Sequence, residues 1–375
     1  SLDNCRATIG NRVDDVSVDQ DPLELGGELG CISSNLGSSA LKASYRLHAG
    51  NAVGRLEFDL PDISPGERTP LIAGVMRDWN EPFEIVSGQV SVEGVYRWWK
   101  SGAGQHRERL RLELAMQGLG GYYDSVLFSG LESGAAAEFL PRISTAEFAE
   151  VRIALLDIGV PIKDSRFKIK LEPSAQGALP RVLIDALRLP LFDGEIQGDD
   201  IRIDLNADEH DFVILADGLD LASMVETQQL DGLVATGILD GSIPVTLTPR
   251  GARVSGGSLK AREPGGKIQY AAGGSEVIGR ASQGSEILLR VLEDLRYDSL
   301  EVKLYYQEDG AMEMQLALQG ISPHVDASRP VHFNLNLQQN LLKLLEQLRL
   351  TVGISDKIDR SVLEYFSDRV GTGAR

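Results

Sequence analysis

The sequence has little cysteine, no long apolar run and no basic run. Lysine and arginine number 37 against 55 aspartate and glutamate, so the net charge of the 375 residues is −18. Because phosphate backbones are bound by clustered basic side chains, nucleic acid is not expected as a partner. The same charge argues against electrostatic adsorption to an anionic membrane surface. No run of 18 apolar residues is present, so no helix is expected to span a bilayer.

Motifs of enzymes and metal sites are also missing. No G-x-S-x-G elbow of a hydrolase nucleophile occurs. The Gly-Gly-Lys segment at 265–267 is not a phosphate loop, because Ile268 stands where such a loop has serine or threonine. Asp199, Asp200 and Asp204 are close together but lack calcium-loop spacing, and the histidines form no H-x-x-x-H pair. We therefore expect no catalytic residue, no metal and no cofactor. A glycosidase pair of carboxylates stays open, although no pair stands out.

The two cysteines allow two interpretations. Cys5 and Cys31 have the spacing of neither a zinc ribbon nor a redox motif. In an oxidising compartment they would form one disulfide, and in a reducing compartment two buried thiols. The chain starts at Ser1 without methionine and without a signal-peptide pattern. We therefore expect a mature or excised fragment, for which any targeting segment would lie upstream.

What the sequence does have is period-two alternation of apolar and polar residues. Such alternation predicts antiparallel strands with one apolar face and one polar face. It runs through residues 55–60, 109–116, 201–205, 301–306, 312–318 and 331–337. The length is therefore better explained by one elongated sheet than by two or three domains.

Turn chemistry separates these runs, and helices are few. The 40 glycines predict turns and bulges, with expected turns at 193–194, 198–199, 217–218, 240–241, 256–257, 264–266 and 309–310. Short helices are expected at 221–228, capped by Asp220, at 286–295, capped by Ser285, at 341–348, and from the cap Ser355 to about residue 370. They are expected to plug the ends of the sheet. No βαβ rhythm is present, which argues against a dinucleotide-binding fold.

The series of motifs after residue 190 is similar to a known family. It reads Leu-Phe-Asp-Gly-Glu-Ile-Gln-Gly at 191–198, Gly-Ile-Leu-Asp-Gly-Ser-Ile-Pro-Val at 237–245 and Arg-Pro-Val-His-Phe-Asn-Leu-Asn-Leu at 329–337. In this order the segments resemble the C-terminal region of YdbH-like proteins, a branch of the AsmA-like envelope proteins. The resemblance covers roughly residues 181–348. It extends less clearly to the N-terminal half.

The resemblance implies a periplasmic bridge that carries phospholipids between the inner and outer membranes of Gram-negative bacteria. It also implies a small outer-membrane lipoprotein bound at the C-terminal end, and an inner-membrane anchor upstream. The expected fold is mainly β, an elongated, curled antiparallel sheet that forms a hydrophobic groove. Residues 1–180 would be its N-terminal part, 181–348 the YdbH-like C-terminal groove, and 349–375 a helical tail.

A sheet with one apolar face must cover that face with another layer, with itself by curling, or with a ligand. Because helices are few, we expect a curled sheet that leaves an apolar trough. Acyl chains that slide along such an apolar face need no single essential residue. Methionine suits this face, because its flexible thioether adapts to chains that shift. The expected lining is Ile201, Ile203, Leu205, Ile243, Val245, Leu247, Val302, Leu304, Tyr306, Met312, Met314, Leu316, Leu318, Val331, Phe333, Leu335 and Leu337. Each of these residues is also an ordinary choice for a packed core.

An open sheet has unpaired edges onto which a partner adds a strand. The last strong strand, 331–337, is the expected edge for the lipoprotein, with Val331, His332, Asn334 and Asn336 as its contact residues. An internally paired or helix-covered strand is the alternative.

Two other functions remain open. The same edges suit a scaffold for outer-membrane protein assembly that binds no lipid. Trp98 and Trp99, beside Tyr96 and Arg97, suit a carbohydrate platform or an aromatic cluster of the sheet.

Overall fold

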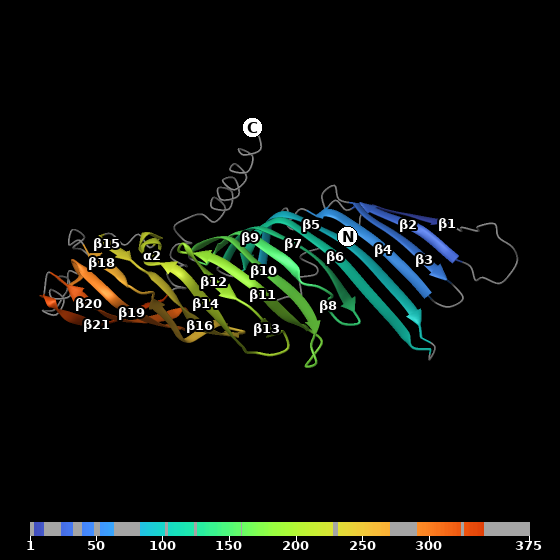
Figure 1. Ribbon diagram of the computed structural model, residues 1–375. Coiled ribbons are helices and arrows are strands. Elements are labelled where there is room, and N and C mark those ends of the chain that lie inside the picture. Colours follow the sequence, from blue (N-terminus) through green and yellow to red (C-terminus); the bar gives the residue numbers. More distant parts are fainter. Residues whose placement is uncertain are drawn as a thin grey trace, which may run out of the picture.

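The protein is one long, curled antiparallel sheet (Figure 1). The computed structural model describes residues 4–10, 24–32, 40–48, 53–63, 83–101, 104–123, 126–158, 160–227, 232–270, 291–323 and 326–340. Over these residues the sheet has 21 strands. The expectation of a mainly β fold with a curled, elongated sheet is confirmed.

The strands follow one another along the sheet much as they do along the chain. They are β1 (Asn4–Gly10), β2 (Glu24–Ile32), β3 (Ala40–His48), β4 (Val53–Ile63), β5 (Phe83–Lys100), β6 (His106–Tyr123), β7 (Val126–Leu140), β8 (Ser144–Thr145), β9 (Ala149–Asp157), β10 (Pro161–Pro173), β11 (Pro180–Leu191), β12 (Gly194–Gly198), β13 (Ile201–Asp204), β14 (His210–Asp220), β15 (Leu233–Thr236), β16 (Ile238–Thr248), β17 (Gly251–Ala261), β18 (Gly266–Tyr270), β19 (Leu295–Tyr306), β20 (Ala311–Ser322) and β21 (Asp326–Asn340). One helix, α2 (Leu221–Thr227), is described.

Each strand pairs mainly with its neighbours in sequence. The main order is β1 to β7, then β9, β10, β11, β12, β14, β16, β17, β19, β20 and β21, and every pairing is antiparallel. β8, β13, β15 and β18 are short strands attached beside it. Within the described part, β1 and β21 do not pair with each other, so the sheet stays open.

The register places the alternating apolar residues on one face. Residues directly opposite each other in an antiparallel pair point to the same face. From β11 to β21 the pairings therefore join Leu189, Ile196, Ala216, Gly241, Leu259, Val302, Leu316 and Leu335 into one continuous row. This apolar row crosses eight strands.

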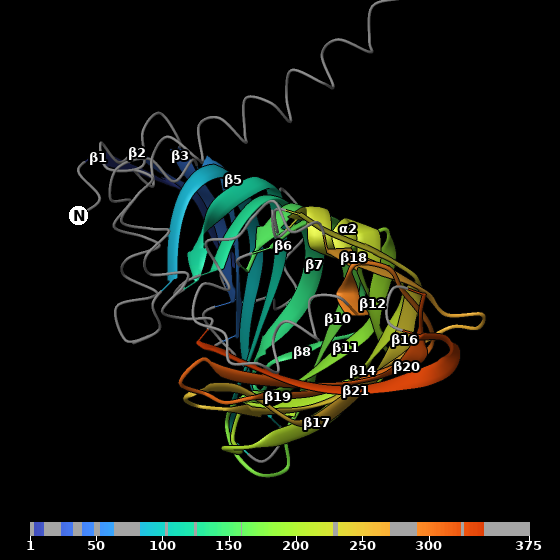
Figure 2. The same ribbon diagram turned by 90° about the vertical axis from the view of Figure 1, so that its left-hand side faces the viewer.

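The core lies on the inner side of the bend. Figure 2, which looks along the molecule, shows β17, β19 and β21 on the side opposite α2 and β18. Leu221 and Met224 of α2 pack against a buried cluster that includes Leu239, Leu259 and Val302. A second cluster, which includes Phe128 and Val151, lies further toward the N-terminus. Burial of apolar area, at about 25 cal/mol per Å², stabilises the curl.

Three expected turns are wrong. The pairs 217–218, 240–241 and 256–257 lie within β14, β16 and β17. Gly218 and Gly256 have positive φ, at 71° and 90°, beside shifts in the pairing register, so they form β-bulges. Gly241 is required by close approach, because a Cβ there would lie 2.0 Å from the carbonyl oxygen of Ser258.

The expected helix after Asp220 is confirmed. The Asp220 carboxylate accepts a hydrogen bond from the backbone N–H of Ala222 at 3.1 Å, which caps α2. The end of the expected helix at 286–295 is wrong, because Leu295 begins β19. The helices expected at 341–348 and up to residue 370 lie outside the described residues. Over the described residues, no helix has both the length and the apolarity to cross a membrane.

Candidate functional site

The candidate site is the apolar face of the C-terminal strands. Opposite one another across β19 and β20 lie Val302 and Leu316, Leu304 and Met314, and Tyr306 and Met312. β21 continues these rows with Leu335 opposite Leu316 and Leu337 opposite Met314. The strands thus place these expected lining residues side by side on one face.

The other expected lining residues join the same face through the register. Ile243 lies opposite Ile214, Val245 opposite both Phe212 and Val254, and Leu247 opposite His210. Ile201 and Ile203 of β13 lie opposite Ile184 and Val182. In β21, Val331 lies opposite Gly320 and Phe333 opposite Leu318.

Leu205 does not belong to the strand. β13 ends at Asp204, and Leu205 lies in the following turn with 44% of its surface exposed. Asp204 ends the strand locally, because its carboxylate accepts hydrogen bonds from the Ser174 hydroxyl at 2.7 Å and from the backbone and side-chain N–H groups of Asn206. These bonds hold the pKa of Asp204 below its usual value, and the Asn206 amide is their largest contribution.

The apolar face is covered only in part. Ile201, Val302 and Leu318 are buried, while Leu337 is 40% exposed. Most of the expected lining is half-buried, namely Ile203, Ile243, Val245, Leu247, Leu304, Tyr306, Met312, Met314, Leu316, Val331 and Leu335. The same chain therefore covers this face in part and leaves some of its apolar surface accessible.

The N-terminal strands carry the same kind of face, although none of the expected lining residues lies on them. Leu56, Tyr96 and Leu110 form one row across β4, β5 and β6, and Phe58, Gly94 and Leu112 form the next. The side chains of the five residues other than Gly94 are half-buried. The alternation of apolar and polar residues at 55–60 and 109–116 is the sequence signal that identifies this N-terminal part of the face. Pairing of β9 with β10 and of β10 with β11 connects this face to the C-terminal one.

The two tryptophans do not form a joint platform. Trp98 stacks on Tyr96, with ring centroids 5.4 Å apart, and it lies across the cross-strand Gly54. Trp99 points to the opposite face because successive residues of a strand alternate. The Tyr96 hydroxyl donates to a Glu108 carboxylate oxygen at 2.7 Å, and this hydrogen bond raises the pKa of Tyr96.

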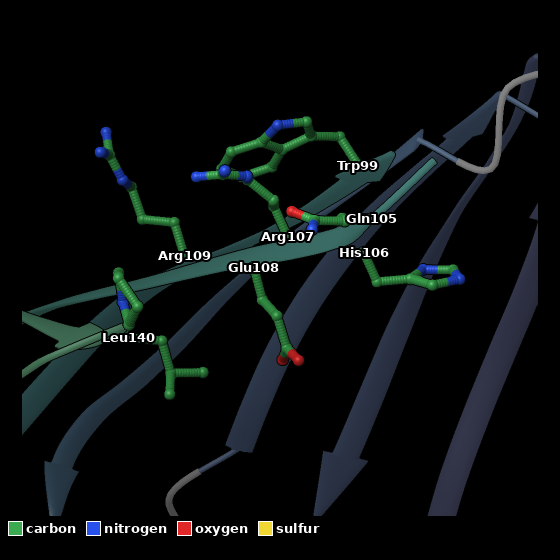
Figure 3. A pocket seen from close by; sticks show the side chains of 8 residues that line it. Trp99, Gln105, His106, Arg107, Glu108, Arg109 and Leu140 are labelled. Atoms are coloured by element: carbon green, nitrogen blue, oxygen red, sulfur yellow. The ribbon is translucent and has the colours of Figure 1, made fainter. Parts of the chain in front are cut away.

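A cavity of about 460 Å³ lies at the tip of the β5–β6 hairpin. Figure 3 shows Trp99, Arg107 and Arg109 on one side of the β6 ribbon, and Glu108 and Leu140 on the other side. His106, Gln105 and Pro141 complete its lining. The cavity therefore lies where the polar and apolar faces of the sheet meet.

The acidic residues near β13 are held by arginines. Asp199 accepts from Arg188 at 3.2 Å, and Asp200 accepts from Arg202 at 2.9 Å. Over the described residues there is no group of histidine, cysteine, aspartate or glutamate side chains that suits a metal ion.

β21 lies at the end of the sheet. Within the described residues it pairs with β20 alone. His332, Asn334 and Asn336 are exposed on its polar face, whereas Val331 belongs to the opposite, apolar face. At the other end of the sheet, the register of β1 and β2 places Cys5 directly opposite Cys31.

Comparison with known families finds a match over most of the chain. Residues 26–363 match the model of the YdbH-like family, which is described as the intermembrane phospholipid transport protein YdbH. The chain belongs to the YdbH-like family. The YdbH-like match covers both the N-terminal and the C-terminal strands, so it extends beyond the 181–348 segment in which the resemblance is clearest. Comparisons with curated proteins and with solved structures gave no match.

Proposed function

We propose that this chain carries phospholipids through the periplasm toward the outer membrane, with their acyl chains on the apolar face of the curled sheet. The observation that carries the proposal is the apolar row from Leu189 to Leu335, which runs across eight strands. Four of its members, Ile196, Ala216, Leu259 and Val302, are buried. Its ends at Leu189, Leu316 and Leu335 and neighbours on the same face such as Leu304 and Met314 are only half-buried. The description of the YdbH-like family supports it. An inner-membrane anchor outside this sequence belongs to the same proposal.

The physical reason is the cost of exposing an acyl chain to water. Sixteen methylenes at about 0.8 kcal/mol each amount to about 13 kcal/mol. A continuous apolar face removes most of this barrier, because the chain slides from one row of side chains to the next. The headgroup stays in water meanwhile.

Photo-crosslinking tests whether lipid lies on this face. A benzophenone amino acid replaces Leu304 or Leu112 on the apolar face, and in matched controls Lys303 or Arg111 on the opposite face. After irradiation of protein from cells, mass spectrometry should find phospholipid attached at positions 304 and 112 and not at positions 303 and 111. Equal labelling on both faces, or none at Leu304 and Leu112, contradicts the proposal.

We also propose that the edge of β21 receives a strand of a small outer-membrane lipoprotein. An unpaired edge offers backbone N–H and C=O groups for strand addition. Crosslinkers at Asn334 and Asn336 should capture the lipoprotein, whereas one at Lys303, in an internal strand, should not. Capture of outer-membrane proteins instead would favour the assembly-scaffold function.

A further inference from the structure

Four arginines lie in a row on the polar face of the N-terminal strands. Register pairs Arg46 with Arg55, Arg55 with Arg97, and Arg97 with Arg109, across β3, β4, β5 and β6. Arg107 follows, directly opposite Trp99. Like charges that lie directly opposite one another in a sheet repel and destabilise it. In a chain with a net charge of −18, this concentration of positive charge requires an explanation.

Acidic side chains neutralise only some of these arginines. Arg55 is paired with Glu57, and Arg109 lies 3.5 Å from a carboxylate oxygen of Glu138. Within the part of the chain whose side chains the structure describes, Arg97 and Arg107 have no acidic partner. The nearby Glu108 points to the other face and accepts the Tyr96 hydroxyl. An anion is therefore the missing partner of this cluster.

The surroundings of the cluster combine charge with apolar surface. The hairpin-tip cavity is bordered by Arg107, Arg109 and the indole of Trp99, and by Leu140 from the apolar side. Tryptophan prefers positions where its ring touches hydrocarbon and its N–H meets polar groups, as at a membrane interface. Arginine binds phosphate oxygens through paired N–H donors.

We propose that Arg97, Arg107 and Arg109 bind the phosphate of a phospholipid headgroup at the tip of the β5–β6 hairpin. The inference rests on the proposed function, because the acyl chains of the same lipid lie on the apolar face beside Tyr96, Trp98 and Leu110. The headgroup crosses the rim of the sheet at the hairpin tip, where the two faces meet. A free phosphate would use the arginines but gain nothing from Trp99 and Leu140.

The charge of the cluster also predicts which lipid it selects. A zwitterionic headgroup carries an ammonium or choline cation next to its phosphate, and this cation is repelled by the row of arginines. A headgroup with a net negative charge has no such penalty. The cluster therefore favours anionic phospholipids, and the preference falls as salt screens exposed charges.

Equilibration with mixed vesicles tests this. The chain is incubated with equal amounts of phosphatidylglycerol and phosphatidylcholine, separated from the vesicles, and its lipid is quantified by mass spectrometry. We expect the native chain to be enriched about fivefold in phosphatidylglycerol, as two exposed charge pairs imply. The R97Q/R107Q double variant should lose the enrichment and keep its total lipid. The R152Q/R202Q variant, which removes two arginines with 64% and 60% of their side chains exposed elsewhere, should resemble the native chain.

The outcomes separate this inference from the proposed function. If the native chain holds no lipid, both fall. If it holds lipid without enrichment, or if R97Q/R107Q stays enriched, only the inference falls. The inference is also overturned if inorganic phosphate, at a concentration equal to that of the lipid, abolishes the phosphatidylglycerol enrichment, because the cluster then binds free phosphate. The same effect of polyglutamate would assign the cluster to an acidic protein. Because R97Q/R107Q removes repulsion between like charges, its melting temperature should not fall, so misfolding is detected separately.

Discussion

Single glycines in the family-like motifs are explained by close backbone contact. Gly241 belongs to the Asp-Gly-Ser-Ile-Pro segment at 240–244 and sits in the long apolar row between Ala216 and Leu259. A Cβ at this position would lie 2.0 Å from the Ser258 carbonyl oxygen and 2.8 Å from the Leu259 Cα. Because both contacts are with backbone, no side-chain rotation relieves them.

Gly241→Ala should therefore destabilise the sheet. Overpacking of this kind costs about 1–3 kcal/mol, and the backbone contact favours the upper end. Gly134→Ala is the matched control, since its Cβ would meet nothing nearer than 3.8 Å. Denaturant unfolding monitored by circular dichroism gives both values. A G241A variant as stable as G134A would show that β16 and β17 separate easily.

Tyr297 is a second residue with a specific structural role. Its side chain is buried, its hydroxyl donates to the Thr236 carbonyl oxygen at 2.7 Å, and burial, with a smaller contribution from Asp220, raises its pKa to about 12. The folded pKa lies above the usual value of 10.0, so the stabilisation is complete below pH 10 and is lost as the pH rises through 12.

Tyr297→Phe should cost about 1–2 kcal/mol of unfolding free energy at neutral pH, the effect of a lost buried hydrogen bond. Because phenylalanine does not ionise, the difference between native and variant should shrink as the pH rises from 10 to 12. Unfolding titrations at several pH values measure it. A difference that stays constant up to pH 12 would mean that the Tyr297 hydroxyl reaches water in the folded protein.

At the scale of strands, the β1–β2 hairpin supports the disulfide that the sequence left open. Residues directly opposite in an antiparallel pair have Cα atoms about 4.5–5.5 Å apart, within the range that a disulfide spans. Cys5 and Cys31 occupy such positions. In an oxidising compartment we expect them to be bonded, with a stabilisation of about 3 kcal/mol in the loop-entropy model.

Intact mass under non-reducing conditions tests the bond. The chain recovered from an oxidising compartment should be lighter by two hydrogens than after reduction, and the Cys31→Ser variant should not change mass on reduction. Detection of two alkylated thiols without reductant would leave the cysteines as a pair of free thiols.

The sequence predicts which segments form strands and which of their residues share a face, but it does not predict how neighbouring strands are aligned. Met312–Leu318 and Val302–Tyr306 alternate so regularly that their shared face follows from period two alone. By contrast, Ala186 has a φ of 49° beside a register shift between β10 and β11. Such a bulge changes which residues face inward. Asp-Gly pairs at 217–218 and 240–241 have turn-like composition, yet the neighbouring strands keep them within β14 and β16.

The arginine row was missed for the same reason. In the sequence, Arg46, Arg55, Arg97 and Arg109 are separated by up to 42 positions and form no basic run. Only the pairing of β3 to β6 brings them together. The net charge of −18 therefore describes the chain as a whole but not this one patch.

At the scale of the whole molecule, the apolar face is extended along the sheet and is not an enclosed pocket. The apolar face runs from β4 to β21, because each main strand of the sheet pairs with the next one. The structure gives no lining residue a unique role. In the proposed transport, a lipid that passes along this face crosses every row in turn. The rows therefore act in series.

Series transport makes a specific prediction about two distant substitutions. Leu112→Asp on β6 and Met314→Asp on β20 each place a carboxylate on the apolar face, where an ion in contact with hydrocarbon costs several kcal/mol. Each should slow phospholipid transfer between vesicles bridged by the chain by about tenfold or more. The double variant should be at most about twofold slower than the slower single variant, because resistances in series add and do not multiply. Arg111→Asp and Lys303→Asp, on the opposite face of β6 and β19, should transfer lipid at the native rate. Losses that multiply in the double variant would mean that the two halves of the sheet bind lipid independently, and normal transfer by both single variants would remove the apolar face from the pathway.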